Sequence, residues 1–494
     1  VLTGETVMAQ ALPWISIVVG ASFLAVVTRV AVPPLTWLSL LLLLHGSRSI
    51  STTTGAAGFW LALYLAMVVG WRGYMPVSGP IYFVFTAAFA ITIALPFLLD
   101  RLALRRVDMA AALLFPATFV AMEFVRSRML STWGSIAYTQ YGTLPLMQVT
   151  AVVGIWGITF LLAWFASASE LALRHGPAWS AGGKHLFLFA AIAAVVWTCG
   201  AVRVTRAPTN RPSMRVATIN RPLDLFAPGE ITRITEGRVS PDEREAFGDK
   251  IRRLHDWFLI GTQREARAGA RLVVWPEQNL LVFKDDEAAF LERAVHVAAD
   301  EHVYIAIGMG TIHLGERLPF ENKLVLINPD GHIEMSYRKE HPVAGWEASI
   351  MRVGNGGLQV RPTAAGRIAG AICFDADFPE FIRTAGRGGA DIFVLPTNEW
   401  RAIKDLHLQM HVFRAIENGM PIVRAAAVGL SAAIDPWGRV LAVSDHLAPG
   451  DTTLVAQLAT GHVTTLYSQI GDAFAWLCII GVAAFWAHFC TRFL

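Results

Sequence analysis

Charged residues are scarce in this chain of 494 residues, where Asp, Glu, Lys and Arg together make up 16%, against about 25% in an average soluble protein. A disordered chain is therefore excluded, because disorder requires low hydrophobicity and high net charge. A wholly soluble protein is disfavoured, because 54% of the residues are hydrophobic and many of them form long blocks. The net charge of +3 gives no reason to expect a nucleic-acid partner.

Cysteine is also scarce, with four residues in the chain. Three of them lie inside apolar blocks and only Cys373 lies in the polar part, so the sequence predicts no disulfide framework. Recognisable metal and cofactor motifs are lacking as well. His407 and His411 stand four residues apart, but the glutamate of a zinc-binding helix is missing between them. We expect a hydrogen-bonding or structural role for these histidines, and neither a metal nor a cofactor.

Long apolar blocks occupy the two ends of the chain. A helix needs about 20 apolar residues to cross a bilayer. The blocks predict a transmembrane bundle of about seven spans in residues 1–207 and a final span in residues 467–494. The predicted spans are Leu12–Val27, Val30–Leu44, Ala57–Val69, Ile81–Leu99, Met109–Val125, Val149–Ser167, Leu186–Val202 and Phe474–Phe489.

The positive charges of the short loops predict the orientation of these spans. Lys and Arg are enriched in loops that stay inside the cell, and they are more frequent on the side that holds both termini. The bias predicts that residues 208–466 are exported. The residues counted are Arg48, Arg101, Arg105, Arg106, Arg174, Lys184 and Arg492 on the inner side, and Arg29, Arg72, Arg126 and Arg128 on the outer side.

Residues 208–466 contain short apolar runs that alternate with amphipathic segments. Runs of four to six residues are typical of β-strands, and the amphipathic segments have helical spacing. This mixture predicts one α/β-type domain. The runs are Met214–Ile219, Leu272–Trp275, Tyr304–Met309, Leu324–Ile327, Ile368–Ile372 and Ile392–Leu395, and the helical segments are Asp242–Ala268, Asp285–Glu301 and Lys404–Asn418.

Three of the predicted strands end in side chains that can carry chemistry. Glu277 follows Pro276, which we expect to stop its strand, Lys339 follows the second strand of a hairpin, and Cys373 ends a strand rich in small residues. Each has a structural alternative: a helix cap, a solvated charge and a small core residue, respectively. Together they predict a base, an electrostatic partner and a nucleophile.

The order Trp275–Glu277, Tyr337–His341 and Ile372–Asp375 resembles the Glu–Lys–Cys triad of the nitrilase, or carbon–nitrogen hydrolase, superfamily. Further matching segments are Glu123–Gln148, Pro396–Trp400, His407–Arg424 and Gly429–Pro436. Such a domain between seven spans and one span is similar to the apolipoprotein N-acyltransferases of the bacterial inner membrane. The resemblance implies an α-β-β-α sandwich beside a bundle of about eight helices.

The resemblance also implies a reaction. Cys373 would be the nucleophile and Glu277 the general base, and Lys339 would stabilise the oxyanion together with the backbone N–H after the cysteine. An acyl chain would pass from a phospholipid, through a thioester, to the amino-terminal amine of a diacylglyceryl-cysteine of an apolipoprotein. The supporting residues would be Glu347, Phe374, Asp375 and Asn398.

The chain departs from the acyltransferase pattern beside the triad. Phe374 and Asp375 stand where Tyr-Glu is usual, and Ala344–Trp346 stands where Pro-Phe-Gly is usual. All three triad members are kept, but these departures leave the identity of the acceptor open. Trp346 is one candidate for contact with substrate or lipid.

Leu280, Leu281 and Phe283 are further candidates for contact with lipid, because their apolar run follows Glu277 directly. The alternative for this run is a buried strand. Two other functions also stay open for the whole chain: a membrane-tethered amidase that uses water as acceptor, and a catalytically silent sensor or scaffold. The intact triad speaks against the silent protein, and the membrane spans speak against a hydrolase of small polar amides.

Overall fold

A computed structural model describes residues 4–50, 53–104, 111–175, 181–450 and 452–493 of the chain. The chain divides into two compact units, one formed by Val1–Ala207 with Ile470–Leu494 and the other by Pro208–Gln469. Arg105, Arg106 and Met109, which enter the predictions of topology and of the fifth span, lie outside the described residues.

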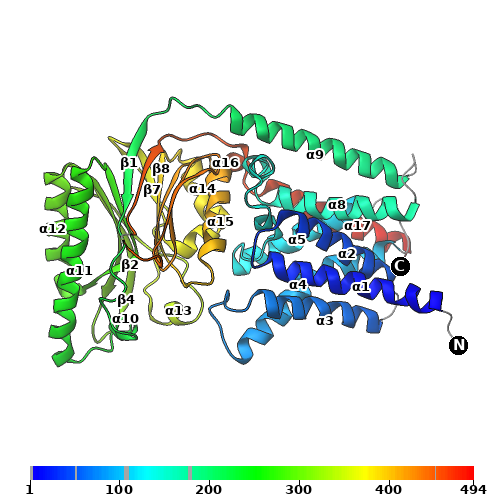
Figure 1. Ribbon diagram of the computed structural model, residues 1–494, viewed down its shortest axis with the longest axis horizontal. Coiled ribbons are helices and arrows are strands. Elements are labelled where there is room, and N and C mark those ends of the chain that lie inside the picture. Colours follow the sequence, from blue (N-terminus) through cyan, green and yellow to red (C-terminus); the bar gives the residue numbers. More distant parts are fainter. Residues whose placement is uncertain (1–3, 51–52, 105–110, 176–180, 451, 494) are drawn as a thin grey trace. The chain divides into compact units, whose positions relative to one another are not determined.

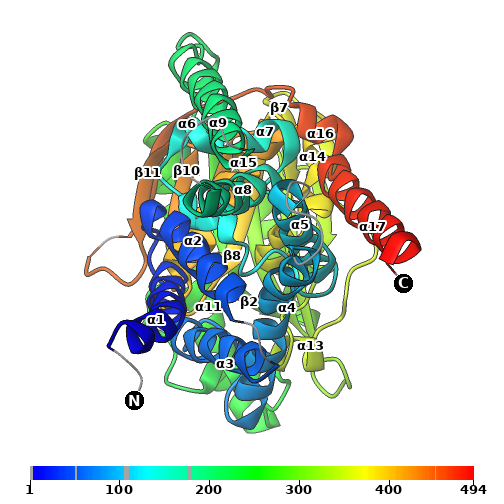
Figure 2. The ribbon, with the colours of Figure 1, turned by 90° about the vertical axis from the view of Figure 1, so that its right-hand side faces the viewer.

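The first unit is a helical bundle, as predicted (Figure 2). Its long helices are α1 (Gly4–Val27), α2 (Pro33–Ser49), α3 (Thr53–Gly70), α4 (Pro80–Leu104), α5 (Ala111–Leu130), α8 (Trp156–His175), α9 (Ala181–Thr205) and α17 (Ala473–Phe493), and its short ones are η1 (Ile136–Gln140), α6 (Leu144–Met147) and α7 (Thr150–Val153). In the described part of the chain, five helices are long and apolar enough to cross a membrane: α3, α4, α8, α9 and α17. The predicted number of about eight spans therefore remains approximate.

The predicted span Val149–Ser167 is wrong at its start. Helix α7 ends at Val153, before Gly154, whose φ of +67° lies in the left-handed region, and α8 begins only at Trp156. Glycine adopts this conformation at little cost and commonly ends a helix there. The apolar composition continues across the break, so hydropathy alone did not reveal it.

Buried ion pairs hold the helices of this unit together. Arg48 donates to both carboxylate oxygens of Asp100, at 2.8 and 2.9 Å, and both side chains are inaccessible to solvent. Glu123 accepts hydrogen bonds from the hydroxyl of Thr159 and the backbone of Ile136. Buried charges in an apolar unit require such partners. Arg48 is therefore part of the packing and not a free loop charge.

The second unit contains two six-stranded sheets. The first has the order β12-β1-β2-β3-β4-β5 and the second the order β11-β10-β9-β8-β7-β6. The strands are β1 (Ser213–Thr218), β2 (Leu272–Phe283), β3 (Tyr304–Ile312), β4 (Phe320–Ile327), β5 (Ile333–Arg338), β6 (Val360–Thr363), β7 (Gly366–Gly370), β8 (Ile392–Asn398), β9 (Ile422–Ala427), β10 (Leu430–Ile434), β11 (Val440–Asp445) and β12 (Leu454–Ala459).

Helices cover the outer faces of the two sheets (Figure 1). Helices α11 (Pro241–Arg267) and α12 (Glu287–Asp300) lie on the first sheet, and α14 (Pro379–Arg387) and α15 (Lys404–Asn418) lie on the second. The predicted α-β-β-α sandwich is confirmed. The remaining short helices of the unit are α10 (Glu230–Thr235), η2 (Lys284–Asp286), α13 (Trp346–Ile350), η3 (Cys373–Asp377) and α16 (Leu466–Ile470).

Helix α11 shows how the sequence builds this layer. Ser240 and Glu243 form a capping box that satisfies backbone donors at its start. The apolar side chains Ile251, Leu254 and Phe258 follow at helical spacing and are buried against the first sheet. Parallel pairing of β1 with β2 and of β7 with β8 brings the carboxyl ends of neighbouring strands to the same edge of each sheet, where sites commonly form.

Candidate active site

Glu277 lies in a bulge inside β2. Trp275 pairs with Ile307 and Leu280 pairs with Met309, so Pro276–Asn279 stand opposite the single residue Gly308. A Cβ atom on Gly308 would lie 2.4 Å from the carbonyl oxygen of Pro276, which explains the glycine there. The prediction that Pro276 ends the strand is wrong, because β2 resumes after the bulge. The bulge frees Glu277 from the ladder, as bulges beside active sites commonly do.

The continuation of β2 also corrects the predicted lipid loop. Leu280, Leu281 and Phe283 are each at most 1% exposed and pack in the core beneath α11. They are paired with β3, so they are a buried strand and cannot contact lipid. Of the predicted lipid candidates, Trp346 alone is exposed, at 40%. Its indole Nε1 donates to Glu236 at 2.9 Å.

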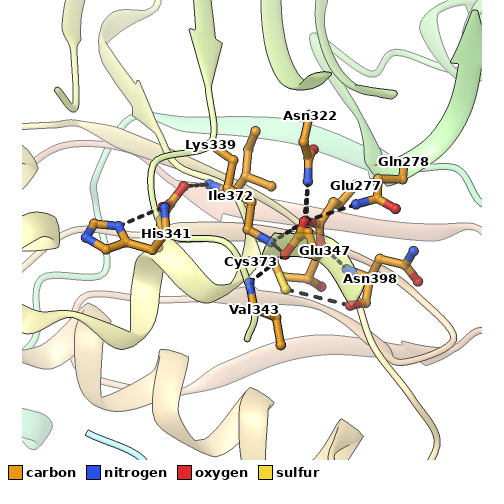
Figure 3. A network of polar contacts seen from close by, with 12 residues as sticks. Glu277, Gln278, Asn322, Lys339, His341, Val343, Glu347, Ile372, Cys373 and Asn398 are labelled. Atoms are coloured by element: carbon orange, nitrogen blue, oxygen red, sulfur yellow. Dashed lines mark hydrogen bonds and ion pairs between the residues drawn. The ribbon is translucent and has the colours of Figure 1, made fainter. Parts of the chain in front are cut away.

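Lys339 follows β5 directly and points into the space between the sheets. Its Nζ donates to Glu277 at 2.8 Å and to both carboxylate oxygens of Glu347, at 2.9 and 2.8 Å (Figure 3). The lysine is 1% exposed and the two glutamates are 1% and 6% exposed. One buried cation therefore holds two buried carboxylates, and the carboxylate of Glu347 also accepts from the backbone N–H of Val343 at 2.7 Å.

Cys373 begins the 3-10 turn η3, which follows β7. Its φ of +48° lies in the left-handed region, a conformation that costs a non-glycine residue about 1–3 kcal/mol and clusters at active sites. The thiol is 5% exposed. Gly370 lets this strand end approach the first sheet, because a Cβ atom there would lie 2.6 Å from Leu324.

The backbone of Asn398 links the carboxylate of Glu277 and the thiol of Cys373. Its backbone N–H donates to Glu277 at 2.7 Å, and its carbonyl oxygen accepts from the Cys373 thiol at a donor–acceptor distance of 3.7 Å. The three predicted triad residues thus lie in one hydrogen-bonded group (Figure 3). Asn398 stands at the end of β8, so the backbone contributes as much to the arrangement as the side chains.

Asp375 fixes the turn that carries the thiol. Its carboxylate accepts from the hydroxyl of Tyr337 at 2.7 Å and from the backbone N–H of Ile372 and of His341, at 3.2 and 2.8 Å. The turn after β7 is thereby joined to the end of β5, which Lys339 follows directly. Phe374, the other departure from the acyltransferase pattern, packs edge-on against Phe378 at 5.3 Å between ring centroids.

Asn322 is a site residue that the sequence prediction missed. Its side-chain amide donates to Glu277 at 2.7 Å and to Glu347 at 3.1 Å. The strand that carries it was predicted to begin at Leu324, whereas β4 begins four residues earlier, at Phe320. The missing part contains the polar residues Glu321, Asn322 and Lys323, so the apolar run gave no signal for it, although a buried amide needs hydrogen-bond partners.

Burial and charge shift the pKa values of the triad. Burial raises the pKa of Glu277, and Glu347 raises it further against the opposing effect of Lys339. Burial alone would lower the pKa of Lys339, but the two carboxylates hold it well above its ordinary value. Burial and then the charge of Glu277 raise the pKa of the Cys373 thiol. The lysine is therefore a cation, and the thiol needs a base beside it to react.

A second buried network lies next to the turn. His407 contacts Asp377 at 3.1 Å through Nε2 and Glu399 through Nδ1. His411 accepts from Arg424 at 2.9 Å. Burial lowers the pKa of His407, but the two carboxylates outweigh it and raise the pKa to about 9. Both histidines make hydrogen bonds, as predicted. The ligand atoms of Asp377, His407 and His411 also lie within 4.8 Å of one another, so the expectation that the two histidines hold no metal stays a prediction.

The comparisons with known proteins agree with this architecture. Residues 251–467 match the carbon–nitrogen hydrolase family. Residues 17–168 match the apolipoprotein N-acyltransferase N-terminal domain. The resemblance predicted from the sequence is therefore confirmed: a segment that matches the N-terminal domain of apolipoprotein N-acyltransferases precedes one that matches the carbon–nitrogen hydrolases.

Curated relatives cover most of the chain. An apolipoprotein N-acyltransferase of Geobacter metallireducens is 26% identical over 92% of this chain and 90% of its own length. One from Bradyrhizobium diazoefficiens is 26% identical over 78% of this chain and 74% of its own length. Among solved structures, an amidase from Nesterenkonia sp. is 20% identical, with a TM-score of 0.41, over 53% of this chain and 95% of its own.

Proposed function

We propose that this protein is a membrane N-acyltransferase that uses Cys373 as its nucleophile. The donor is a phospholipid, and the acceptor is the amino-terminal amine of a diacylglyceryl-cysteine on an apolipoprotein. The observation that carries the proposal is the buried group of Glu277, Lys339 and Cys373, joined through the Asn398 peptide, in a chain with apolar membrane helices. The names of the relatives support the acceptor.

In the first half-reaction, Glu277 takes the proton of the Cys373 thiol and the sulfur attacks the ester carbonyl of the donor. Lys339 and the backbone N–H after the cysteine stabilise the oxyanion. The C–O bond of the ester breaks, and the lysophospholipid leaves with the proton from Glu277. The raised pKa of Glu277 suits a group that must first accept and then return a proton.

In the second half-reaction, the amine attacks the thioester. Glu277 receives a proton from the attacking nitrogen and passes it to the sulfur as the C–S bond breaks, so the amide forms and the thiol of Cys373 and the carboxylate of Glu277 are both restored. Glu347 holds Lys339 between two carboxylates, so the cation keeps its place in both half-reactions.

Intact-mass analysis of the purified protein tests this proposal. With a phospholipid donor, the mass of the protein increases by one acyl chain, and a Cys373→Ala variant gains nothing. A diacylated lipopeptide with a free amino terminus then removes the added mass, whereas its N-acetylated copy does not. Rapid release of free fatty acid that the lipopeptide does not change would show that water is the acceptor and would favour an amidase-type hydrolase.

We further propose that the second unit faces the outside of a bacterial inner membrane. The structure removes Arg48 from the inner charges and Arg126 from the outer ones, because both are buried. One charge is lost on each side, so the bias toward an inside N-terminus keeps its sign. If the second unit faces outward, a membrane-impermeant maleimide added to intact spheroplasts labels a variant with Ala348→Cys at an exposed position more strongly than it labels the unsubstituted protein. Labelling only after lysis would contradict the orientation.

A further inference from the structure

Arg221 is a half-buried cation without a carboxylate partner. It follows β1, and its Nε donates to the side chain of Asn279 at 3.1 Å, while Nη1 makes one long contact, 3.4 Å, with the carbonyl of Pro222. The guanidinium lies 5.6 Å from the ring centroid of Phe226. Within the described parts of the chain, Arg221 forms no ion pair, and burial lowers its pKa with no carboxylate to oppose the effect.

Two contacts hold Arg221 beside the candidate active site. Asn279 lies in the β2 bulge, two residues after Glu277. On the other side, the carbonyl oxygen of Arg221 accepts from His446 Nε2 at 3.0 Å, and His446 Nδ1 accepts from the backbone N–H of Val428 at 2.9 Å. Val428 follows the residue that pairs with Asn398 at the end of β8. Arg221 therefore stands next to the strand ends that carry the acid and the Asn398 peptide.

The neighbourhood of Arg221 also has a surplus of hydrogen-bond donors. Asn220 is 5% exposed, and its Oδ1 accepts from Asn279 at 3.2 Å. Its Nδ2 has no acceptor among the described residues. Burial lowers the pKa of His446, against the opposing effect of its hydrogen bond to the backbone carbonyl of Arg221. A half-buried cation without a carboxylate and a buried unpaired amide are both costly unless an anion binds there.

We propose that Arg221, with the amide of Asn220, binds a phosphate-class anion, and that this anion is the phosphodiester of the lipid acyl donor. The inference rests on the proposed function. A guanidinium fork matches the geometry of phosphate oxygens. A phospholipid carries its phosphodiester on the same glycerol as the ester that Cys373 attacks, so an anion site beside the triad orients the donor.

Donor preference tests the inference. Acylation of Cys373 is measured by intact mass with a phospholipid and with a diacylglycerol, which has the same esters and no phosphate. Arg221→Gln lowers the ratio of phospholipid to diacylglycerol kcat/KM about ten- to hundredfold, as the loss of charge-assisted hydrogen bonds predicts. Arg221→Lys keeps the charge but not the guanidinium fork, so its ratio lies between those of the wild type and of Arg221→Gln. Arg215→Gln, at an exposed position of β1, keeps the wild-type ratio.

A binding measurement separates this inference from the proposed function. A Cys373→Ala protein cannot turn over, so its affinity for a lysophospholipid reports binding without acyl transfer, and the effect of Arg221 on that affinity reports the anion site. Adding Arg221→Gln weakens lysophospholipid binding at least tenfold, and inorganic phosphate up to millimolar concentration competes only weakly. Equal affinity with and without Arg221 would overturn the inference, and strong competition by inorganic phosphate would assign the site to the free ion and overturn the lipid as its source. Absence of an acyl-enzyme in the wild type would overturn the proposed function and leave this binding result to be judged separately.

Discussion

Replacing Lys339 by Met removes the one cation that separates two buried carboxylates. Glu277 and Glu347 both accept from the lysine Nζ, at 2.8 and 2.9 Å, so their oxygens lie within about 6 Å of each other by the reach of these two bonds. All three side chains are buried. The variant therefore loses an oxyanion donor and also faces two like charges in a site with little water.

The size of both effects can be worked out. At about 6 Å and an effective dielectric constant of about 20, two like charges repel by about 3 kcal/mol. We expect the free energy of unfolding of the variant to fall by about 3–5 kcal/mol, as is typical when one partner of a buried pair is removed. Uptake of a proton by one of the two carboxylates would relieve this repulsion in place of the lysine. Loss of the oxyanion donor lowers the rate of acylation by about 10²–10³.

A double variant separates these effects. Lys339→Met with Glu347→Gln removes the repulsion, so thermal unfolding shows recovery of much of the lost stability, whereas acylation measured by intact mass remains slow. Lys323→Met is the matched control. Lys323 is also buried and bridges two carboxylates, Glu287 and Glu321, but it makes no contact with the triad among the described residues. A folded Lys339→Met protein with near-normal acylation would refute the reasoning, as would a double variant no more stable than the single one.

The remaining predictions concern the base, the exposed tryptophan and the buried histidine. Glu277→Gln almost abolishes acylation of Cys373 while the protein still folds, because the thiol loses its base; near-normal acylation would assign that role elsewhere. Trp346→Ala slows transfer to a lipopeptide and increases the share of free fatty acid, and unchanged partitioning would remove Trp346 from the substrate path. The pKa of His407 is raised from 6.5 to about 9, so its stabilisation of about 3 kcal/mol is complete below about pH 6.5 and is lost as the pH rises through about 9. In the wild type, the free energy of unfolding measured with denaturant therefore falls as the pH rises between these values. His407→Gln removes this pH dependence, and a pH dependence that persists in the variant would contradict the assignment.

Composition and periodicity predicted a helical membrane unit and one α/β-type domain, whereas the α-β-β-α sandwich was implied by the family resemblance. Apolar blocks located the long helices of the first unit, and the spacing of Ile251, Leu254 and Phe258 located α11. The break at Gly154 was missed because a lone glycine in an apolar block carries no hydropathy signal. The end of each element depends on single dihedral angles and caps, which a pattern of composition does not contain.

The candidate site was predictable only where its residues follow strands in sequence. Glu277, Lys339 and Cys373 each follow an apolar run, and the structure brings them together. Asn322 and the backbone of Asn398 were not predicted as contacts of the acid, because they meet it through pairing between distant segments. The misreading of Leu280–Phe283 has the same origin, since Pro276 was assumed to end a strand that instead bulges and continues.

The corrected position of Leu280–Phe283 changes how water can be kept from the thioester. Water is far more concentrated than any lipid-borne amine, so a transferase must keep its acyl-enzyme dry. The continuing strand lies in the protein core and cannot form a wall of the acyl site. The exposed segment that adjoins the triad is Val343–Trp346, which Glu347 ties to Lys339 through the Val343 N–H. The same glutamate thus contacts the cation and anchors the loop, so under the proposed function we expect a change at Glu347 to affect both.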